Sequence, residues 1–364
     1  RLVVFHTNDI HGWIMSRPDQ QGQKVGGASA LAAVIAKERG HKLVFDAGDW
    51  FQGTPEGSLS KGRAVAAVFN ALPYDAVAVG NHDFDNGEQG LKELIAGIRV
   101  PVLSANIYRD GRRVDYVKPW IIKDVAGIKV GVFGLLTTKM RSLSFPDNIA
   151  GLEFRREVDE ARLAVQELRA AGATVIIALT HVGFEGKDTK LEGDQTIAWE
   201  VEGIDLIVGG HTHTVVPKAE HDPVHGTLIV QAGSYLAHGG RVELWIDSET
   251  KKVVSSSGFL VDLHLDKTGE DSKMLAVVEA QSAAVSREFD VVVATAAATL
   301  LRNRGGESSL GDWMTDCTRH WAKTDIAFQN GGGIRADIEA GPVTLRSLFN
   351  VMPFENRLVK LTMT

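Results

Sequence analysis

Short apolar runs alternate with amphipathic stretches along most of the chain. The apolar runs, each bounded by Gly, Asp or Asn, predict buried strands at residues 2–5, 42–45, 76–79, 100–105, 128–134, 174–179 and 205–208. Stretches with helical patterning lie between them and predict helices over 26–40, 62–72 and 157–172, the last with apolar residues three and four apart. Such alternation is typical of an α/β fold. Shorter β-like runs between 226 and 262 end this first unit.

The length of the chain predicts more than one folding unit. It has 364 residues, whereas single hydrophobic cores stop growing at about 250 to 300 residues. We expect a first unit over 1–265 and a second unit over 291–364. The charged stretch 266–290 between them is expected to form one exposed connecting helix. Because this second unit is short and its last residues (RLVKLTMT) are strand-like, we expect it to be the N-terminal part of a larger, truncated domain.

Composition excludes several classes of function. The net charge of −7 provides no basic footprint for nucleic acid as a bulk ligand, and no run approaches the roughly 18 apolar residues of a membrane span. Cys317 is the single cysteine, so zinc-type Cys clusters are absent and any metal must be bound by His, Asp and Asn. The chain starts at Arg1, directly in a strand, which indicates that a leader was removed or the chain was shortened.

Polar side chains directly follow five of the predicted strands, in the motifs HTNDIHG, DAGDWFQG, GNHDFDNG, THVGFEG and GGHTHT. In an open parallel sheet the carboxyl ends of the strands form one crevice, so we expect these side chains to converge. Residues two apart in an extended exit can also point to the same side. The candidate metal ligands are Asp9, His11, Asp49, Asn81, His181, His211 and His213.

The chemistry of these ligands indicates a pair of metal ions. Carboxylate, amide and imidazole donors suit Mn, Zn, Fe(II), Co or Ni, and seven ligands exceed one catalytic zinc site but fit two bridged ions. Lowering the pKa of water from about 15.7 to about 7 supplies roughly 12 kcal/mol. General base catalysis alone supplies roughly 3 to 5 kcal/mol. The larger contribution favours metal-dependent hydrolysis of a phosphate ester.

Taken in order, NDIHG, GDWFQG, GNHDFDNG, THVGFE and GGHTH resemble the metal-site motifs of the calcineurin-like metallophosphoesterases. The longer segments DAGDWFQGTPEGSLSKG and VAVGNHDFDNG resemble the 5'-nucleotidase branch, and the resemblance extends over the whole chain. It implies a β-sandwich flanked by helices, followed by an incomplete α/β substrate-binding domain. It further implies that water activated by two divalent metal ions hydrolyses nucleoside 5'-monophosphates to nucleoside and phosphate, in the periplasm or outside the cell.

The resemblance also implies a role for each candidate. Asp49 would bridge the two metals, with Asp9, His11 and His213 completing one site and Asn81, His181 and His211 the other. By the same resemblance, His82 acts on the phosphate as a stabiliser or acid, with Asp85 as its partner. Three residues apart, these two side chains can meet on a first helical turn, where the carboxylate favours the charged imidazole. Asp83 is expected to be only a helix-start carboxylate.

The second unit contains two segments that indicate the substrate. RGGESSLGDWMTD at 304–316 resembles the family's opening helix, and FQNGGGIRADI at 328–338 resembles its Gly-rich substrate loop, where glycines let the backbone approach a ligand closely. A simple turn is the other interpretation of this loop. By resemblance the substrate-binding residues are Arg304, Asn330, Gly332, Gly333, Arg335 and Phe354, the last stacking on the base.

Several other functions stay open at this stage. On the same site the substrate could be a UDP-sugar, a 2',3'-cyclic nucleotide or a sulfur-bound carrier. The chain could instead be a non-catalytic metal-binding surface protein, although His82 and Asp85 favour an enzyme because neither is needed to hold metal. Histidines outside these motifs are expected to be surface or core residues: His41, His221, His225, His238, His264 and His320.

Overall fold

The computed structural model describes residues 1–19, 21–185, 192–303 and 305–362. One sheet has the order β17-β16-β1-β4-β5-β6 and consists of β1 (Leu2–Thr7), β4 (His41–Asp46), β5 (Ala76–Ala78), β6 (Val102–Leu103), β16 (His238–Ile246) and β17 (Val253–Asp262). The other has the order β14-β15-β13-β12-β10-β9 and consists of β9 (Trp120–Val125), β10 (Ile128–Leu136), β12 (Val175–His181), β13 (Leu206–Gly209), β14 (Glu220–His221) and β15 (Leu228–Val230). In each sheet four neighbouring strands are parallel. In the first sheet these are β1, β4, β5 and β6, and β16 and β17 add antiparallel pairings on one side. In the second sheet they are β10, β12, β13 and β15, and β9 and β14 pair antiparallel at the two edges.

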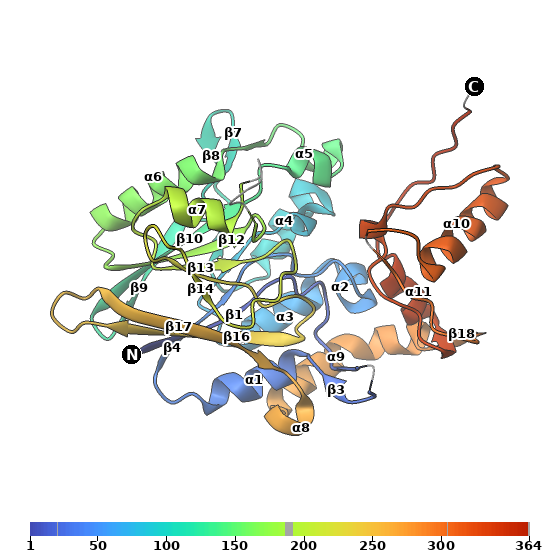
Figure 1. Cartoon of the computed structure of the whole chain (residues 1–364), viewed down its shortest axis with the longest axis horizontal. Coiled ribbons are helices and arrows are strands. Elements are labelled where there is room, and N and C mark those ends of the chain that lie inside the picture. Colours follow the sequence, from blue (N-terminus) through green and yellow to red (C-terminus); the bar gives the residue numbers. More distant parts are fainter. Residues whose placement is uncertain (20, 186–191, 304, 363–364) are drawn as a thin grey trace.

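The two sheets pack face to face, and helices cover both outer faces (Figure 1). The helices over the first sheet are α1 (Ala28–Lys37), α3 (Arg63–Ala71) and α4 (Gly87–Ala96), and those over the second are α6 (Glu157–Ala170) and α7 (Asp194–Glu200). The short helix α2 (Pro55–Leu59) lies against α3. Leu2 and Val4 of β1 point into the core between the sheets, whereas Val3 and Phe5 point into the core under the helices. Burial on both faces explains why these strands are uninterrupted apolar runs in the sequence.

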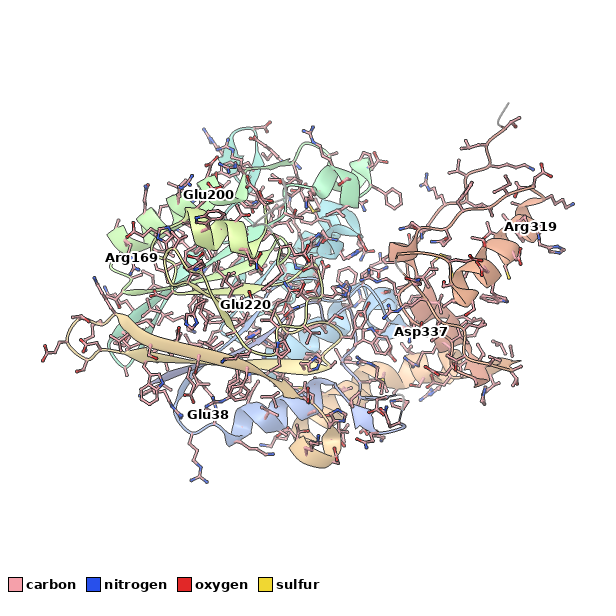
Figure 2. All side chains as sticks on the ribbon, in the orientation of Figure 1. Glu38, Arg169, Glu200, Glu220, Arg319 and Asp337 are labelled. Atoms are coloured by element: carbon pink, nitrogen blue, oxygen red, sulfur yellow. The ribbon has the colours of Figure 1, made fainter. Side chains whose placement is uncertain are left out.

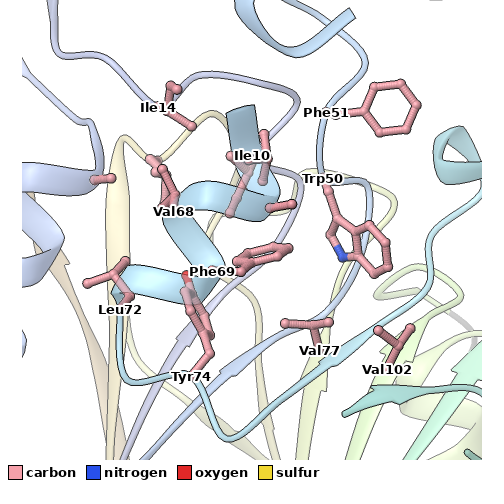
Figure 3. Close-up of a cluster of buried hydrophobic side chains, with 14 of the residues drawn as sticks. Ile10, Ile14, Trp50, Phe51, Val68, Phe69, Leu72, Tyr74, Val77 and Val102 are labelled. Carbon is pink, nitrogen blue, oxygen red and sulfur yellow. The ribbon is translucent and has the colours of Figure 1, made fainter. Parts of the chain in front are cut away.

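The predicted α/β class and the helix-flanked sandwich are confirmed. The parallel strands belong to two sheets and end at a common edge, so the expected convergence arises from a sandwich and not from one open sheet. Figure 3 shows part of the core under the first sheet's helices, where Trp50 and Tyr74 both meet Phe69 edge to face, with ring centroids 5.8 and 5.0 Å apart. Trp50 follows Asp49 directly, so this core fixes the backbone of a candidate metal ligand.

The connecting stretch differs from the expected single exposed helix. It forms two helices, α8 (Leu265–Thr268) and α9 (Ser272–Phe289). Met274 and Val278 of α9 are buried in the same core as α1 and α3. The helix is therefore part of the first unit's packing along one side, which its many charged residues concealed in the sequence.

A smaller C-terminal part lies at one end of the sandwich (Figure 1). It contains β18 (Val292–Ala296), α10 (Ser309–Ala322), the 3-10 turn η3 (Gly331–Gly333), β19 (Gly341–Thr344) and α11 (Leu345–Val351). The strands pair antiparallel, and a small core forms around Leu310, Ile334 and Ile338. Gln52 of the first unit donates a hydrogen bond to the Pro353 carbonyl, so the two parts touch beside the Asp49 loop.

Arg346 of α11 links this part to the sandwich. Its Nη1 donates to both carboxylate oxygens of Glu56, at 2.6 and 2.7 Å, and its Nε to Asp290. Glu56 is only 2% exposed, so Arg346→Ala leaves a buried charge without its partner. We expect this change to lower the free energy of unfolding by about 3 kcal/mol, measured by urea denaturation.

The matched control is Arg319→Ala. Arg319 lies on α10 at the outer side of the C-terminal part (Figure 2) and pairs with Asp316, and both side chains are at least half exposed. Its loss should change the free energy of unfolding by less than about 1 kcal/mol. Equal changes in the free energy of unfolding for the two substitutions would show that the Arg346–Glu56 pair stabilises the protein no more than an exposed ion pair does.

Candidate metal centre

Five strands from the two sheets bring the candidate ligands to one edge of the sandwich. Asp9 and His11 follow β1, and Asp49 follows β4 in the same sheet. Asn81 follows β5, and in the second sheet His181 is the last residue of β12. The pair His211 and His213 follows β13. The sequence motifs therefore converge because both sheets end their parallel strands at this edge.

The first cluster contains Asp9, His11 and His213, with one ligand atom of each lying within 4.8 Å of the others. His213 Nε2 lies 3.3 Å from Asp9 Oδ1 and 3.1 Å from His11 Nε2. His11 Nδ1 donates to the Gln52 carbonyl at 2.7 Å, which leaves its Nε2 lone pair facing the cluster. Two imidazole nitrogens this close are suited to share one cation.

The second cluster contains Asp49, His181 and His211 within the same limit. His181 Nδ1 donates to the Ala47 carbonyl at 2.7 Å, so its Nε2 faces inward. That buried Nε2 has no hydrogen-bond partner among the described residues, although Asp49 Oδ2 lies 3.1 Å away. Asn81 Oδ1 lies 2.8 Å from His211 Nδ1 and so adds an amide oxygen to the cluster.

Asp49 lies between the two clusters. Its Oδ2 is 3.1 Å from His181 Nε2 and 3.7 Å from His11 Nε2. Its Oδ1 accepts a 2.8 Å hydrogen bond from the backbone N–H of His82. A Cβ on Gly80 would overlap Asp49 backbone and carboxylate atoms, so only glycine fits there. Asp49 is therefore placed to contact a cation at either cluster.

Five of the seven candidate ligands have backbone conformations that L-residues disfavour. Their φ angles fall between 51° and 81°, in the left-handed region, at Asp9, His11, Asp49, His211 and His213. Each such residue costs about 1 to 2 kcal/mol. Strain of this kind concentrates at functional sites, where the surrounding structure has to offset it.

Two buried residues hold these loops, and neither role was apparent from the sequence. Asn8 Nδ2 donates to Asp9 Oδ2 and to the Gly233 carbonyl, each at 2.7 Å. Asp83 is fully buried and accepts from the backbone N–H groups of Trp50 (2.9 Å), Gly80 (2.7 Å) and Asp49 (3.2 Å). Its interpretation as only a helix-start carboxylate is wrong, since it joins the loops after β4 and β5. The feature of the sequence that could have indicated this role is the position of Asp83 within the polar motif GNHDFDNG.

The electrostatics of the site favour added positive charge. Burial acts to raise the pKa of Asp9, but the nearby His213 and His181 hold it at about 2. Burial also acts against the charge of His181, yet Asp49 and Asp9 raise its pKa to about 10. Burial and the neighbouring His181 lower the pKa of His211 to about 4, which keeps this imidazole neutral and able to ligate. Cations bound here would balance the carboxylates that otherwise draw a proton to His181.

His82 and Asp85 form a separate pair beside the two clusters, because His82 contacts both His11 and Asp49. His82 Nδ1 lies 2.9 Å from Asp85 Oδ2, at the 3-10 turn η1 (His82–Phe84). Burial acts to lower the pKa of His82, but Asp85 and Asp49 raise it overall. Because Asp85 engages Nδ1, the other ring nitrogen, Nε2, is the one left to act on a ligand. The expected first-turn pairing of these residues is present.

A cavity of about 1130 Å³ lies at the site, and residues of the C-terminal part form some of its lining. Asn330, Gly332, Gly333 and Arg335 line it, as does Phe354. The Phe354 ring stacks on His82 with centroids 5.5 Å apart, and Arg335 Nη2 donates to His11 Nε2 at 3.2 Å. The predicted substrate residues thus face the predicted ligands, except Arg304, which lies outside the described residues.

None of the helices in the described part of the chain combines the length and apolar character of a membrane crossing.

Comparison with known proteins matches residues 2–215 to the calcineurin-like phosphoesterases and residues 288–364 to the 5'-nucleotidase C-terminal domain. The chain is 33% identical to a snake venom 5'-nucleotidase of Crotalus adamanteus over 97% of its own length, and it spans 66% of that protein.

Two further relatives agree. The chain is 30% identical to the 5'-nucleotidase of Bos taurus over 97% of its own length and 68% of that protein. The solved structure of a 5'-nucleotidase precursor from Thermus thermophilus superposes with a TM-score of 0.86 at 31% identity, covering 97% of this chain and 74% of the other. The chain therefore belongs to the calcineurin-like phosphoesterases and, within them, to the 5'-nucleotidase family.

Proposed function

We propose that the chain hydrolyses nucleoside 5'-monophosphates to nucleoside and phosphate at a dinuclear divalent metal centre. One observation carries the proposal: two ligand clusters that meet at Asp49 border the same cavity as the His82–Asp85 pair. A metal-binding protein without activity would have no use for that pair. The similarity to proteins named 5'-nucleotidase supports the choice of substrate class.

The residues present fit two metal ions. His181 Nε2 is buried without a hydrogen-bond partner among the described residues, and His11 and His213 turn Nε2 atoms toward each other at 3.1 Å. Asp49 would bridge the ions, with Asp9, His11 and His213 on one and Asn81, His181 and His211 on the other. Oxygen and imidazole donors without thiolate suit Zn, Mn, Fe, Co or Ni. Two such ions supply a water of lowered pKa and positive charge for the phosphoryl oxygens.

His82 has the geometry to supply a proton. Hydrolysis breaks the bond between phosphorus and the 5' oxygen, and that oxygen needs a proton as it leaves. Asp85 holds Nδ1 of the imidazole and favours its charged form, so Nε2–H of His82 can donate to the leaving oxygen or to a phosphoryl oxygen. After product release the imidazole regains its proton from solvent.

The C-terminal part would bind the rest of the substrate. Arg335 and Asn330 offer a cation and an amide for phosphate or ribose, while Gly332 and Gly333 let the backbone approach closely. Phe354 contributes a ring surface for the base, and Arg304 completes the proposed set. In this scheme residues 1–265 form the metallophosphoesterase domain, 266–290 connect, and 291–364 belong to the substrate-binding domain. We infer an extracellular or periplasmic location, and the venom origin of one relative supports a place outside the cell.

Metal dependence provides the direct test of this function. Phosphate release from AMP should fall at least about 100-fold after EDTA treatment and return when Mn(II), Zn(II) or Co(II) is added, because the metals supply the largest share of the barrier reduction. UDP-glucose, 2',3'-cyclic AMP and a model thiosulfonate should react more slowly in parallel assays. A preference for one of these three compounds would assign a different substrate within the family. If no ester is hydrolysed in a metal-dependent way, the proposal is wrong.

A further inference from the structure

The cavity lining combines two kinds of chemistry. Its polar part includes Asp49, Asn81, His211 and His213 of the ligand clusters, together with His82 and Arg335. Its other part includes a wall formed by residues 142–148, and Leu59 and Met352 also line the cavity. This wall contains the end of α5 (Met140–Leu143) and the 3-10 turn η2 (Pro146–Ile149). Figure 1 shows α5 on the side of the sandwich nearest the C-terminal part.

The wall is anchored at both ends and exposes two apolar side chains between them. Met140 and Ile149 are buried in the core of the first unit. Leu143 and Phe145 are 38% and 56% exposed, and both line the cavity. The backbone N–H of Asn148 donates to the Phe145 carbonyl at 3.0 Å, which closes the backbone turn that begins at Phe145.

The wall is also linked to the His82–Asp85 pair. Asn148 Nδ2 donates a 3.0 Å hydrogen bond to the backbone carbonyl of Asp85, the residue that holds His82. This hydrogen bond joins the segment that carries the apolar wall to the residue that positions the proposed proton donor. A substrate whose phosphate lies at the metal site would have this wall within the same cavity as its leaving group.

The other lining phenylalanines expose less ring surface. Phe51 is only 2% exposed, and Phe349 meets Phe289 edge to face. Phe354, which the proposed function already assigns to the base, is partly covered because it stacks on His82 and has the Arg335 guanidinium 5.6 Å from its ring centroid. Phe145 is the cavity aromatic with the largest exposed ring, so it has the most apolar surface for a ligand to cover.

We propose that Phe145, with Leu143 beside it, is a specificity-determining surface that contacts the nucleobase of the substrate. The inference rests on the proposed nucleotide hydrolysis and names the part of the chain that selects the leaving group. A base is flat and apolar on its faces, and stacking of a base on an aromatic side chain tolerates any base. The phosphoesterase unit itself would then contribute to base recognition.

The test compares AMP with ribose 5-phosphate, which has the same 5' ester and sugar but no base. In Phe145→Ala we expect kcat/KM to fall about tenfold for AMP, about 1.4 kcal/mol, and to change less than twofold for ribose 5-phosphate. Phe145→Trp should restore the AMP value. Trp199→Ala is the matched control, because Trp199 is a 46% exposed aromatic residue on α7 outside the cavity lining.

Equilibrium binding of adenosine to the metal-free protein gives a second measurement. We expect about tenfold weaker binding in Phe145→Ala than in the original chain and no change in Trp199→Ala. Weakened adenosine binding together with no turnover of AMP would support the base-contacting surface and contradict the proposed hydrolysis. The role of Phe145 would be wrong if Phe145→Ala kept the original preference for AMP over ribose 5-phosphate. It would also be wrong if adenosine did not bind the original chain, or bound equally well to Phe145→Ala.

Discussion

Asp49→Asn is expected to lower kcat/KM for AMP by at least about 10³-fold and to reduce bound metal from two ions per chain to one or none. Loss of a residue that merely orients a metal ligand costs about 10- to 100-fold, and a shared ligand contacts both ions. Burial acts against ionisation of this carboxyl, yet His181 and His82 hold its pKa well below the usual range, so the native residue supplies a full negative charge. Metal content by mass spectrometry and steady-state kinetics measure the two effects.

Asp316→Asn serves as the control for that substitution. Its side chain is 70% exposed on α10, and the same change of charge there should leave metal content and activity unaltered. Circular dichroism should show that both variants are folded, because Asn at position 49 can still accept the hydrogen bond from His82 N–H. Two bound metals and full activity in Asp49→Asn would refute its bridging role.

His82→Ala should lower kcat for AMP by about 10² to 10⁴-fold, the range for loss of a positioned general acid. Bound metal should stay at two ions per chain, since His82 belongs to neither ligand cluster. Asp85→Asn should have a smaller effect in the same direction, because it weakens the orientation and charge of the imidazole without removing it.

The leaving group distinguishes the two roles open to His82. The 5' alkoxide of AMP needs a proton to leave, whereas p-nitrophenolate does not. If His82 is the acid, His82→Ala should cost far less with p-nitrophenyl phosphate than with AMP. Equal losses with both esters would assign His82 to stabilising the phosphoryl oxygens instead, and no loss with either would remove it from the reaction.

Local pattern was sufficient for the elements of the central sandwich. The runs at 2–5, 42–45 and 174–179 became β1, β4 and β12, because their apolar residues are buried on both faces of a sheet. The same pattern could not show that the strands divide into two sheets, since that depends on which strands pair. Charge also concealed the buried side of α9, where Met274 and Val278 pack on the sandwich.

The candidate site shows the same division. The sequence identified the candidate residues at the strand ends. Asp, His and Asn directly after a buried strand are costly to remove from water unless they bind a partner, so their repeated presence there indicates a site. It could not show the contacts made over long separations, such as the hydrogen bond from Asn8 to Gly233 or those from the loops after β4 and β5 to Asp83. These depend on loops that meet only in the folded chain.

The sequence by itself determined the apolar strands, the order of the polar motifs and the kinds of donor atoms available for metal. Only the tertiary structure decided how close Asp49 lies to His11 and His181, that five candidate ligands adopt left-handed backbone, and that Phe145 lines the same cavity as Phe354. The physical reason is that hydrophobic periodicity is a local property, whereas convergence, backbone strain and shared cavities arise from packing between distant segments.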